Sequence, residues 1–173
     1  MVFEHREPPH FGAGGSDELN DIIGAAEYLL SRSDVEPKRL GVWGGSYGGR
    51  MTSLALASAP QFFATRADYA GISNWVKMPG MDALDEAATK IAFESSPMAH
   101  IDTWRAPVLL MHSDADPNVP LEQTTDLAMA LRNKGVPVEY LMIPDEVHFL
   151  LRHHSWNVIF NATREYCDRQ LKP

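Results

Sequence analysis

Residues 42–51, VWGGSYGGRM, place one serine among four glycines, between two apolar runs. The preceding run, residues 40–44, has the unbroken hydrophobicity typical of a strand buried on both faces. One interpretation is an ordinary turn in which Ser46 caps a following helix. The other is a nucleophile elbow, because Gly44, Ser46 and Gly48 fit the pattern G-x-S-x-G. Either interpretation requires a strand, a tight turn and a helix in that order.

Strand and helix patterns alternate along the rest of the chain. Helices are predicted over residues 16–32, 50–59, 81–93, 120–135 and 154–171, and strands over 40–44, 66–73, 106–116 and 136–149. Apolar residues recur at three- and four-residue steps in the helices, and the strands are short apolar runs. This alternation predicts an α/β fold, a parallel sheet with helices on both faces. With 173 residues, the chain fits one domain over residues 1–173.

Composition restricts the partners that the chain could bind. Its formal net charge is −8, with acids and bases interspersed, which argues against nucleic acid or an anionic membrane as a partner. No apolar stretch approaches the roughly 20 residues of a membrane span, and residues 1–15 do not resemble a signal peptide. A cytoplasmic location is therefore expected. Cys167 is the only cysteine, so no intrachain disulfide can form, and its place in a helical pattern predicts a core position.

Polar residues follow three of the four predicted strands. Ser46 comes after the first strand, Asp114 and Asp116 after the third, and His148 after the fourth. Because the carboxyl ends of parallel strands lie at one edge of a sheet, we expect these side chains to lie close together. Their order along the chain, serine, acid and then histidine, is the order of the α/β-hydrolase triad.

These residue types suit nucleophilic catalysis. A serine hydroxyl is a weak nucleophile that needs a base, and histidine has an ordinary pKa near neutral pH. A carboxylate then orients the imidazole, and the backbone N–H of Tyr47 could donate to an oxyanion. The pattern predicts a serine hydrolase that cleaves acyl esters or peptides through an acyl-enzyme, with Ser46, Asp116 and His148 as the triad. No cofactor is expected.

Each assignment has a rival. Asp114 competes with Asp116 as the acid, although we favour Asp116. His153 and His154, at the start of the last predicted helix, are alternative bases. His112 lies at the end of a strand and is interpreted as a structural hydrogen-bonding residue. The histidines lack nearby acid or cysteine ligands, so no metal site is expected.

Large apolar side chains near these loops could line an acyl pocket. The candidates are Trp75, Met78, Trp104 and Phe149. Such residues lie more often in a core than in a pocket. Trp75 and Phe149 are retained as candidate substrate-binding residues.

Three separated motifs carry a family resemblance. The elbow GGSYGG, the acid loop HSDADPNVP with the segment that follows it, and IPDEVHF together resemble the prolyl oligopeptidase family of serine hydrolases, which includes acylaminoacyl-peptidases and dipeptidyl-peptidases. The likeness runs from about Asp17 to the C-terminus. It implies that Ser46, Asp116 and His148 are the catalytic residues. In the family the acid follows the histidine that opens its loop by four residues, as Asp116 follows His112.

The resemblance also implies missing parts. The chain supplies about four of the usual eight strands of an α/β-hydrolase sheet, and it encodes no β-propeller. The absent half carries the second oxyanion donor of the family, a tyrosine hydroxyl. The strand near Leu40–Gly44 then becomes an edge strand. Three explanations are open for this edge. A missing N-terminal half of the protein pairs with it, a second copy of the chain pairs with it, or residues 1–15 add some pairing. A catalytically weak or inactive fragment or assembly module is the alternative function.

Overall fold

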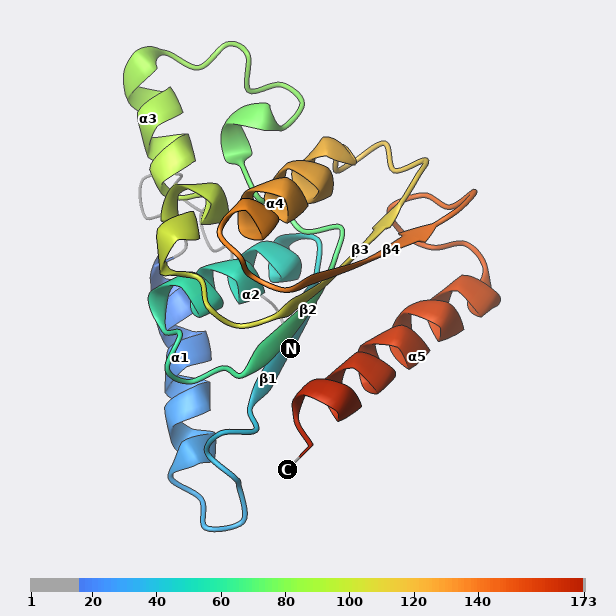
Figure 1. The fold of residues 1–173 in the computed structure, drawn as a ribbon. Coiled ribbons are helices and arrows are strands. Elements are labelled where there is room, and N and C mark those ends of the chain that lie inside the picture. Colours follow the sequence, from blue (N-terminus) through green and yellow to red (C-terminus); the bar gives the residue numbers. More distant parts are fainter. Residues whose placement is uncertain (1–15, 173) are drawn as a thin grey trace, which may run out of the picture.

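The structure is a computed structural model that describes residues 16–172. One sheet has the strand order β1-β2-β3-β4, and every neighbouring pair is parallel (Figure 1). The strands are β1 (Gly41–Gly45), β2 (Thr65–Tyr69), β3 (Val108–Ser113) and β4 (Val138–Ile143). The predicted α/β fold, with four parallel strands, is confirmed. Strands that are consecutive in the sequence are therefore neighbours in the sheet.

In the described part of the chain, five α-helices connect and cover the strands. They are α1 (Ser16–Leu30), α2 (Tyr47–Ser58), α3 (Glu86–Glu94), α4 (Glu122–Asn133) and α5 (His153–Gln170). The predicted helix over 81–93 begins later, because Asp85 accepts a hydrogen bond from the N–H of Ala88 and caps α3 there. Two 3₁₀ helices, η2 (Trp75–Lys77) and η3 (Pro97–Thr103), were not predicted, since such short segments show no helical period.

The helices cover the two faces of the sheet unequally. Helices α1, α2 and α4 lie on one face, and α5 lies on the other (Figure 1). The side chains of β3 alternate between the two cores that result. Val108 and Leu110 pack in the core on the side of α2 and α4, whereas Leu109 and Met111 pack in the core beneath α5. All residues of β3 are buried, as expected of a central parallel strand.

Strand β1 lies at the edge of the sheet, as the resemblance implied. Within residues 16–172 it pairs only with β2. Gly41 and Trp43 are exposed, although the apolar run had predicted a strand buried on both faces. Trp43 lies against Phe160 of α5, and the two rings are 43% and 50% exposed. The sequence of β1 is therefore that of a covered strand, whereas no strand in residues 16–172 covers its outer edge.

Three further expectations from the sequence concern Cys167, membrane-spanning segments and residues 1–15. Cys167 packs against the core beneath α5, as predicted, and burial raises the pKa of its thiol. None of the helices in residues 16–172 is long and apolar enough to cross a membrane. Any strand pairing by residues 1–15 lies outside the described residues.

Candidate active site

Ser46 occupies a strained turn between β1 and α2. Its backbone has φ 55° and ψ −123°, a left-handed conformation that is uncommon outside glycine. Two backbone hydrogen bonds hold it there: its N–H donates to the carbonyl of Tyr69 at 2.8 Å, and its carbonyl accepts from Arg50 at 3.1 Å. This geometry is that of a nucleophile elbow, in which a sharp turn exposes the hydroxyl above the sheet.

The glycines around Ser46 have different roles. A Cβ on Gly44 would lie 2.4 Å from the carbonyl oxygen of Gly48, and one on Gly49 would lie 2.0 Å from Oδ1 of Asp68. These two glycines therefore let α2 pack closely on β1 and β2. Gly48 differs, because a Cβ there would meet nothing within 4 Å. Of the two motif glycines, only Gly44 is required by space.

This difference yields a matched pair of predictions within one motif. Gly44→Ala should lower the free energy of unfolding by at least about 1–3 kcal/mol, because α2 must move away from β1. Gly48→Ala should leave it unchanged or raise it by about 0.5–1 kcal/mol, since alanine suits a helix better than glycine. Urea unfolding of the two variants beside wild type measures both values. Equal losses in the two variants would contradict the packing argument.

His148, in the loop after β4, lies between Ser46 and Asp116. Its Nε2 is 2.8 Å from the hydroxyl of Ser46, and its Nδ1 is 2.7 Å from Oδ2 of Asp116. Nδ1–H donates to the carboxylate, which leaves Nε2 to accept the serine proton. The side chains of His148 and Asp116 are 5% and 0% exposed. The structure thus brings together the three residues that the sequence singled out from three strand ends.

Asp116 rather than Asp114 reaches the histidine. Its second oxygen, Oδ1, accepts hydrogen bonds from the backbone N–H groups of Asn118 at 2.8 Å and Val119 at 3.0 Å. The backbone of its own loop therefore holds the carboxylate through Oδ1, and Oδ2 remains available to His148. Asp114 is exposed.

His112 supports the same loop from beneath. Its Nε2–H donates to the carbonyl of Val119 at 3.0 Å, so its Nδ1 accepts from the hydroxyl of Thr124 at 2.6 Å. Burial lowers the pKa of this imidazole and favours the neutral form. These contacts agree with the interpretation of His112 as a structural residue. Its Nε2 also lies 3.4 Å from Oδ2 of Asp116.

Tyr69, at the end of β2, holds the histidine loop and was not singled out from the sequence. Its hydroxyl lies 2.9 Å from the carbonyl oxygen of His148 and 2.8 Å from Oγ of Ser113. Its ring also stacks on the imidazole, with centroids 6.5 Å apart. Burial raises the pKa of the phenol, which keeps it protonated as a donor. Its place at a strand end was the signal that could have found it.

Glu146 connects the same loop to α5 through hydrogen bonds, and it was also not singled out from the sequence. Its buried carboxylate accepts hydrogen bonds from the hydroxyl of Ser155 at 2.6 Å and from the N–H of Leu151 at 2.9 Å. These bonds, that of Ser155 first, lower the pKa of the carboxyl. The loop that carries His148 is thus tied to the helix that follows it. No sequence pattern marked this acid apart from other loop acids.

The predicted oxyanion donor and substrate-binding residues lie beside Ser46 and His148. Tyr47 is the first residue of α2, where N–H groups have no partner within the helix. The ring of Trp75 lies 6.5 Å from that of Tyr47, between centroids, and the ring of Phe149 lies 5.0 Å from the imidazole of His148. Phe149 is 71% exposed.

Other candidates lie elsewhere. Trp104 is a core residue rather than a pocket wall, because its side chain is buried under the guanidinium of Arg66. His153 and His154 are exposed in the first turn of α5, whereas the hydroxyl of Ser46 is already hydrogen-bonded to His148. Among residues 16–172, no three or more His, Cys, Asp or Glu side chains gather as metal ligands would.

Comparison with known proteins agrees with this architecture. The sequence profile of the prolyl oligopeptidase family matches residues 12–173. The chain is 33% identical over 146 residues to dipeptidyl peptidase family member 6 of Caenorhabditis elegans, which covers 74% of this chain and 20% of that protein. It is 29% identical over 164 residues to dipeptidyl aminopeptidase BIII of Pseudoxanthomonas mexicana, covering 84% of this chain and 24% of that protein.

Solved structures show the same fold. A puromycin-hydrolyzing peptidase of Mycobacterium tuberculosis matches with a TM-score of 0.82 and 28% identity, over 93% of this chain and 26% of that one. An acylaminoacyl peptidase of Pyrococcus horikoshii matches with a TM-score of 0.78 and 25% identity, over 93% of this chain and 29% of that one. The chain spans less than a third of the length of each of these relatives. By its sequence and by its fold, the chain belongs to the prolyl oligopeptidase family, whose members are peptidases of the serine hydrolase class.

Proposed function

We propose that this chain carries the catalytic triad of a serine peptidase or esterase, with Ser46 as nucleophile, His148 as base and Asp116 as the orienting acid. The observation that supports it is the continuous chain of hydrogen bonds from the hydroxyl of Ser46 through His148 to Asp116. The strained backbone of Ser46 adds a second, independent feature of the same chemistry.

The proposed reaction follows from these contacts. The Oγ of Ser46 attacks the carbonyl carbon of the substrate while its proton passes to Nε2 of His148. Asp116 stabilises the imidazolium, and the N–H of Tyr47 donates to the oxygen that becomes negative. The leaving amine or alcohol then takes the proton from Nε2 and departs, which leaves an acyl-serine. A water molecule, deprotonated by the same nitrogen, hydrolyses that ester and restores Ser46.

The relatives suggest the substrate. The four relatives described above are named as peptidases, and the Mycobacterium tuberculosis enzyme is described as puromycin-hydrolyzing. We therefore propose peptides as the substrates of the intact protein. The exposed ring of Phe149 beside His148 leaves the site open, so small activated esters should also reach Ser46.

A fluorophosphonate probe tests this proposal directly. Such a reagent reacts only with a serine whose proton is removed by a positioned base, so the intact mass should rise by one adduct per chain. The adduct should be absent from urea-unfolded protein and from Ser46→Ala. Complete resistance of the folded wild type would favour the alternative, an inactive module.

One observation favours that alternative. Tyr47 offers a single backbone donor to the oxyanion, and the resemblance implied that the second donor lies on strands that are not among the four in residues 16–172. The loss of one such donor typically costs about 2.7–4 kcal/mol of transition-state stabilisation. Labelling slower than that of a full-length family member by about 10²–10³-fold would show this deficit.

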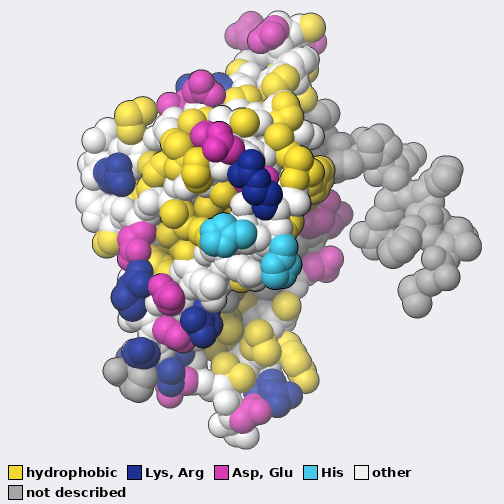
Figure 2. Space-filling view, turned by 90° about the vertical axis from the view of Figure 1, so that its right-hand side faces the viewer, with side chains coloured by type: hydrophobic (Ala, Val, Ile, Leu, Met, Phe, Trp, Pro, Cys, Tyr) yellow, Lys and Arg dark blue, Asp and Glu magenta, His cyan; other side chains and the backbone are white. Residues whose placement is uncertain are grey.

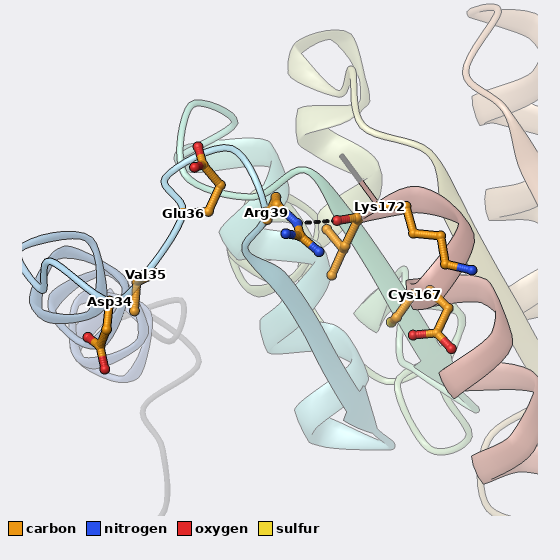
Figure 3. A pocket seen from close by; sticks show the side chains of 8 residues that line it. Asp34, Val35, Glu36, Arg39, Cys167 and Lys172 are labelled. Atoms are coloured by element: carbon orange, nitrogen blue, oxygen red, sulfur yellow. Dashed lines mark hydrogen bonds between the residues drawn. The ribbon is translucent and has the colours of Figure 1, made fainter.

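We also propose that the edge of β1 is a pairing surface. Figure 2 shows hydrophobic side chains exposed on one face of the molecule. Trp43 of β1 and Phe160 of α5 are both exposed, and their ring centroids lie 5.9 Å apart, so the edge strand carries exposed apolar surface. A hollow of about 470 Å³ lies next to it, lined in part by Arg39, Cys167 and Leu171 (Figure 3). A side chain on Gly41 of β1 would touch Leu171, so the hollow adjoins the edge strand.

The mass of the native particle tests the pairing surface. A free, apolar strand edge recruits another strand. For the isolated chain we propose that the recruited strand belongs to a second copy. A dimer that dissociates in Trp43→Lys would support this. If wild type and Trp43→Lys are both monomers, the strand that pairs with this edge would instead belong to a segment of a longer chain.

A further inference from the structure

A cationic side chain lies buried directly behind the candidate nucleophile. Arg50 is in the first turn of α2, four residues after Ser46, and only 2% of its surface is exposed. A buried guanidinium needs compensation for its lost hydration, and burial accordingly lowers its pKa. Burying this charge costs free energy of folding unless the groups around the guanidinium attract it.

Among the contacts of Arg50 are two aromatic rings, a backbone carbonyl and the sulfur of Met51, which lies 3.2 Å from Nη1. Its guanidinium carbon lies 5.2 Å from the centroid of the Tyr47 ring and 5.5 Å from that of Trp75. Both distances are within the range of cation–π attraction, which strengthens when the cation is desolvated. Its Nη2 also donates to the carbonyl of Ser95 at 2.9 Å. One cation thus contacts both rings at the same time.

These contacts join three separate segments. Arg50 belongs to α2, Trp75 begins η2, and Ser95 directly follows α3 as its C-cap. The next residue, Ser96, accepts a hydrogen bond from the backbone N–H of Trp75 at 2.9 Å. The indole is therefore held from its backbone by Ser96 and from its ring by Arg50. Removing the guanidinium would take one orienting contact from the ring, while the backbone hydrogen bond to Ser96 remained.

The two rings lie where a substrate would bind. Tyr47 follows Ser46 directly and supplies the proposed oxyanion donor, and its ring centroid is 6.5 Å from that of Trp75. Both residues are partly exposed, whereas Arg50 is not. The guanidinium therefore lies on the protein side of the rings and leaves aromatic surface for a ligand.

We propose that Arg50 is a positioning residue that fixes Tyr47 and Trp75 as two walls for the acyl group and so sets a preference for acyl groups with an aromatic ring. This rests on the proposed serine hydrolase function. Aromatic groups gain most from such walls because ring pairs attract in tilted or offset arrangements that depend on orientation. A small acyl group would contact neither wall and would not depend on Arg50.

Two phosphonate probes separate these effects, one with an ethyl and one with a benzyl group in the position of the acyl chain. In Arg50→Met the ratio of benzyl to ethyl labelling rates should fall by about thirtyfold, the size of a desolvated cation–π contact. Arg132→Met, which removes an exposed arginine from α4, should leave the ratio unchanged. Trp75→Ala should lower the ratio as Arg50→Met does, and the double variant should add little more.

The outcomes distinguish this inference from the function on which it rests. A wild type that reacts with neither probe overturns both. A reactive wild type whose ratio is unchanged in Arg50→Met, or whose two rates fall together, overturns the positioning role alone. If Arg50→Met does not fold, Arg50→Lys decides, because lysine keeps the charge but lacks the planar group that spans both rings. An intermediate ratio in Arg50→Lys supports the role, and a wild-type ratio overturns it.

Discussion

Replacing His148 with alanine should reduce ester hydrolysis by about 10⁵–10⁶-fold, to the limit of detection. The imidazole Nε2 is 2.8 Å from the hydroxyl of Ser46 and is the acceptor for its proton. Without it the serine is a neutral alcohol, which attacks a carbonyl very slowly. Initial rates with p-nitrophenyl acetate, measured at several protein concentrations, give the ratio of wild type to variant.

The neighbouring histidines supply the control. His153→Ala and His154→Ala remove exposed imidazoles from the first turn of α5, and each should retain a rate within about twofold of wild type. The unfolding midpoint of all three variants should be checked, since His148 is buried beside Tyr69. A loss in His153→Ala as large as that in His148→Ala would assign the base to α5 and contradict this site.

The position of the site could be predicted from the sequence because it depends on topology alone. In a parallel sheet the carboxyl ends of the strands share one edge, so Ser46, Asp116 and His148 were expected to meet. The strand order β1-β2-β3-β4 then brought the three loops together. Asp116 was favoured over Asp114 from the residues, and the family resemblance strengthened that choice. The structure gives its physical basis in the backbone N–H groups that hold its carboxylate.

The residues that hold the site could not be predicted in this way. Tyr69 and Glu146 act through hydrogen bonds to loops whose paths depend on the packed structure. Trp104 looked like a pocket candidate, because a tryptophan in a loop shows no period that tells core from surface. The structure places it in the core instead. Sequence patterns thus located the reacting groups but not their supports.

The ion pair of β2 is a further case in which the sequence misleads. Arg66 and Asp68 alternate along the strand as solvent-facing residues would, yet they are 0% and 2% exposed and form an ion pair. The carboxylate of Asp68 fills the space left by the missing side chains of Gly49 and Gly71. Burial raises the pKa of Asp68, and the charge of Arg66 opposes this rise. The turn at Ser46 therefore lies above a buried, paired charge.

Asp116→Asn should lower the rate of ester hydrolysis by about 10⁴-fold while the fold is retained. In the wild type, Oδ1 accepts from the N–H groups of Asn118 and Val119, and Oδ2 faces Nδ1 of His148. The same two backbone donors will hold the amide oxygen of the new asparagine, so its NH₂ group must face Nδ1. That nitrogen then accepts, the proton moves to Nε2, and Nε2 can no longer take the proton of Ser46.

Asp114→Asn is the matched control for this argument. The substitution is identical and lies two residues away in the same loop, but Asp114 is exposed. Its rate should remain within about twofold of wild type, as for most surface changes. Because the defect in Asp116→Asn is one of tautomer rather than of structure, its urea midpoint should change far less than its rate. An equal loss in the two variants, or a large loss of stability with the activity, would show that Asp116 serves the loop and not the histidine.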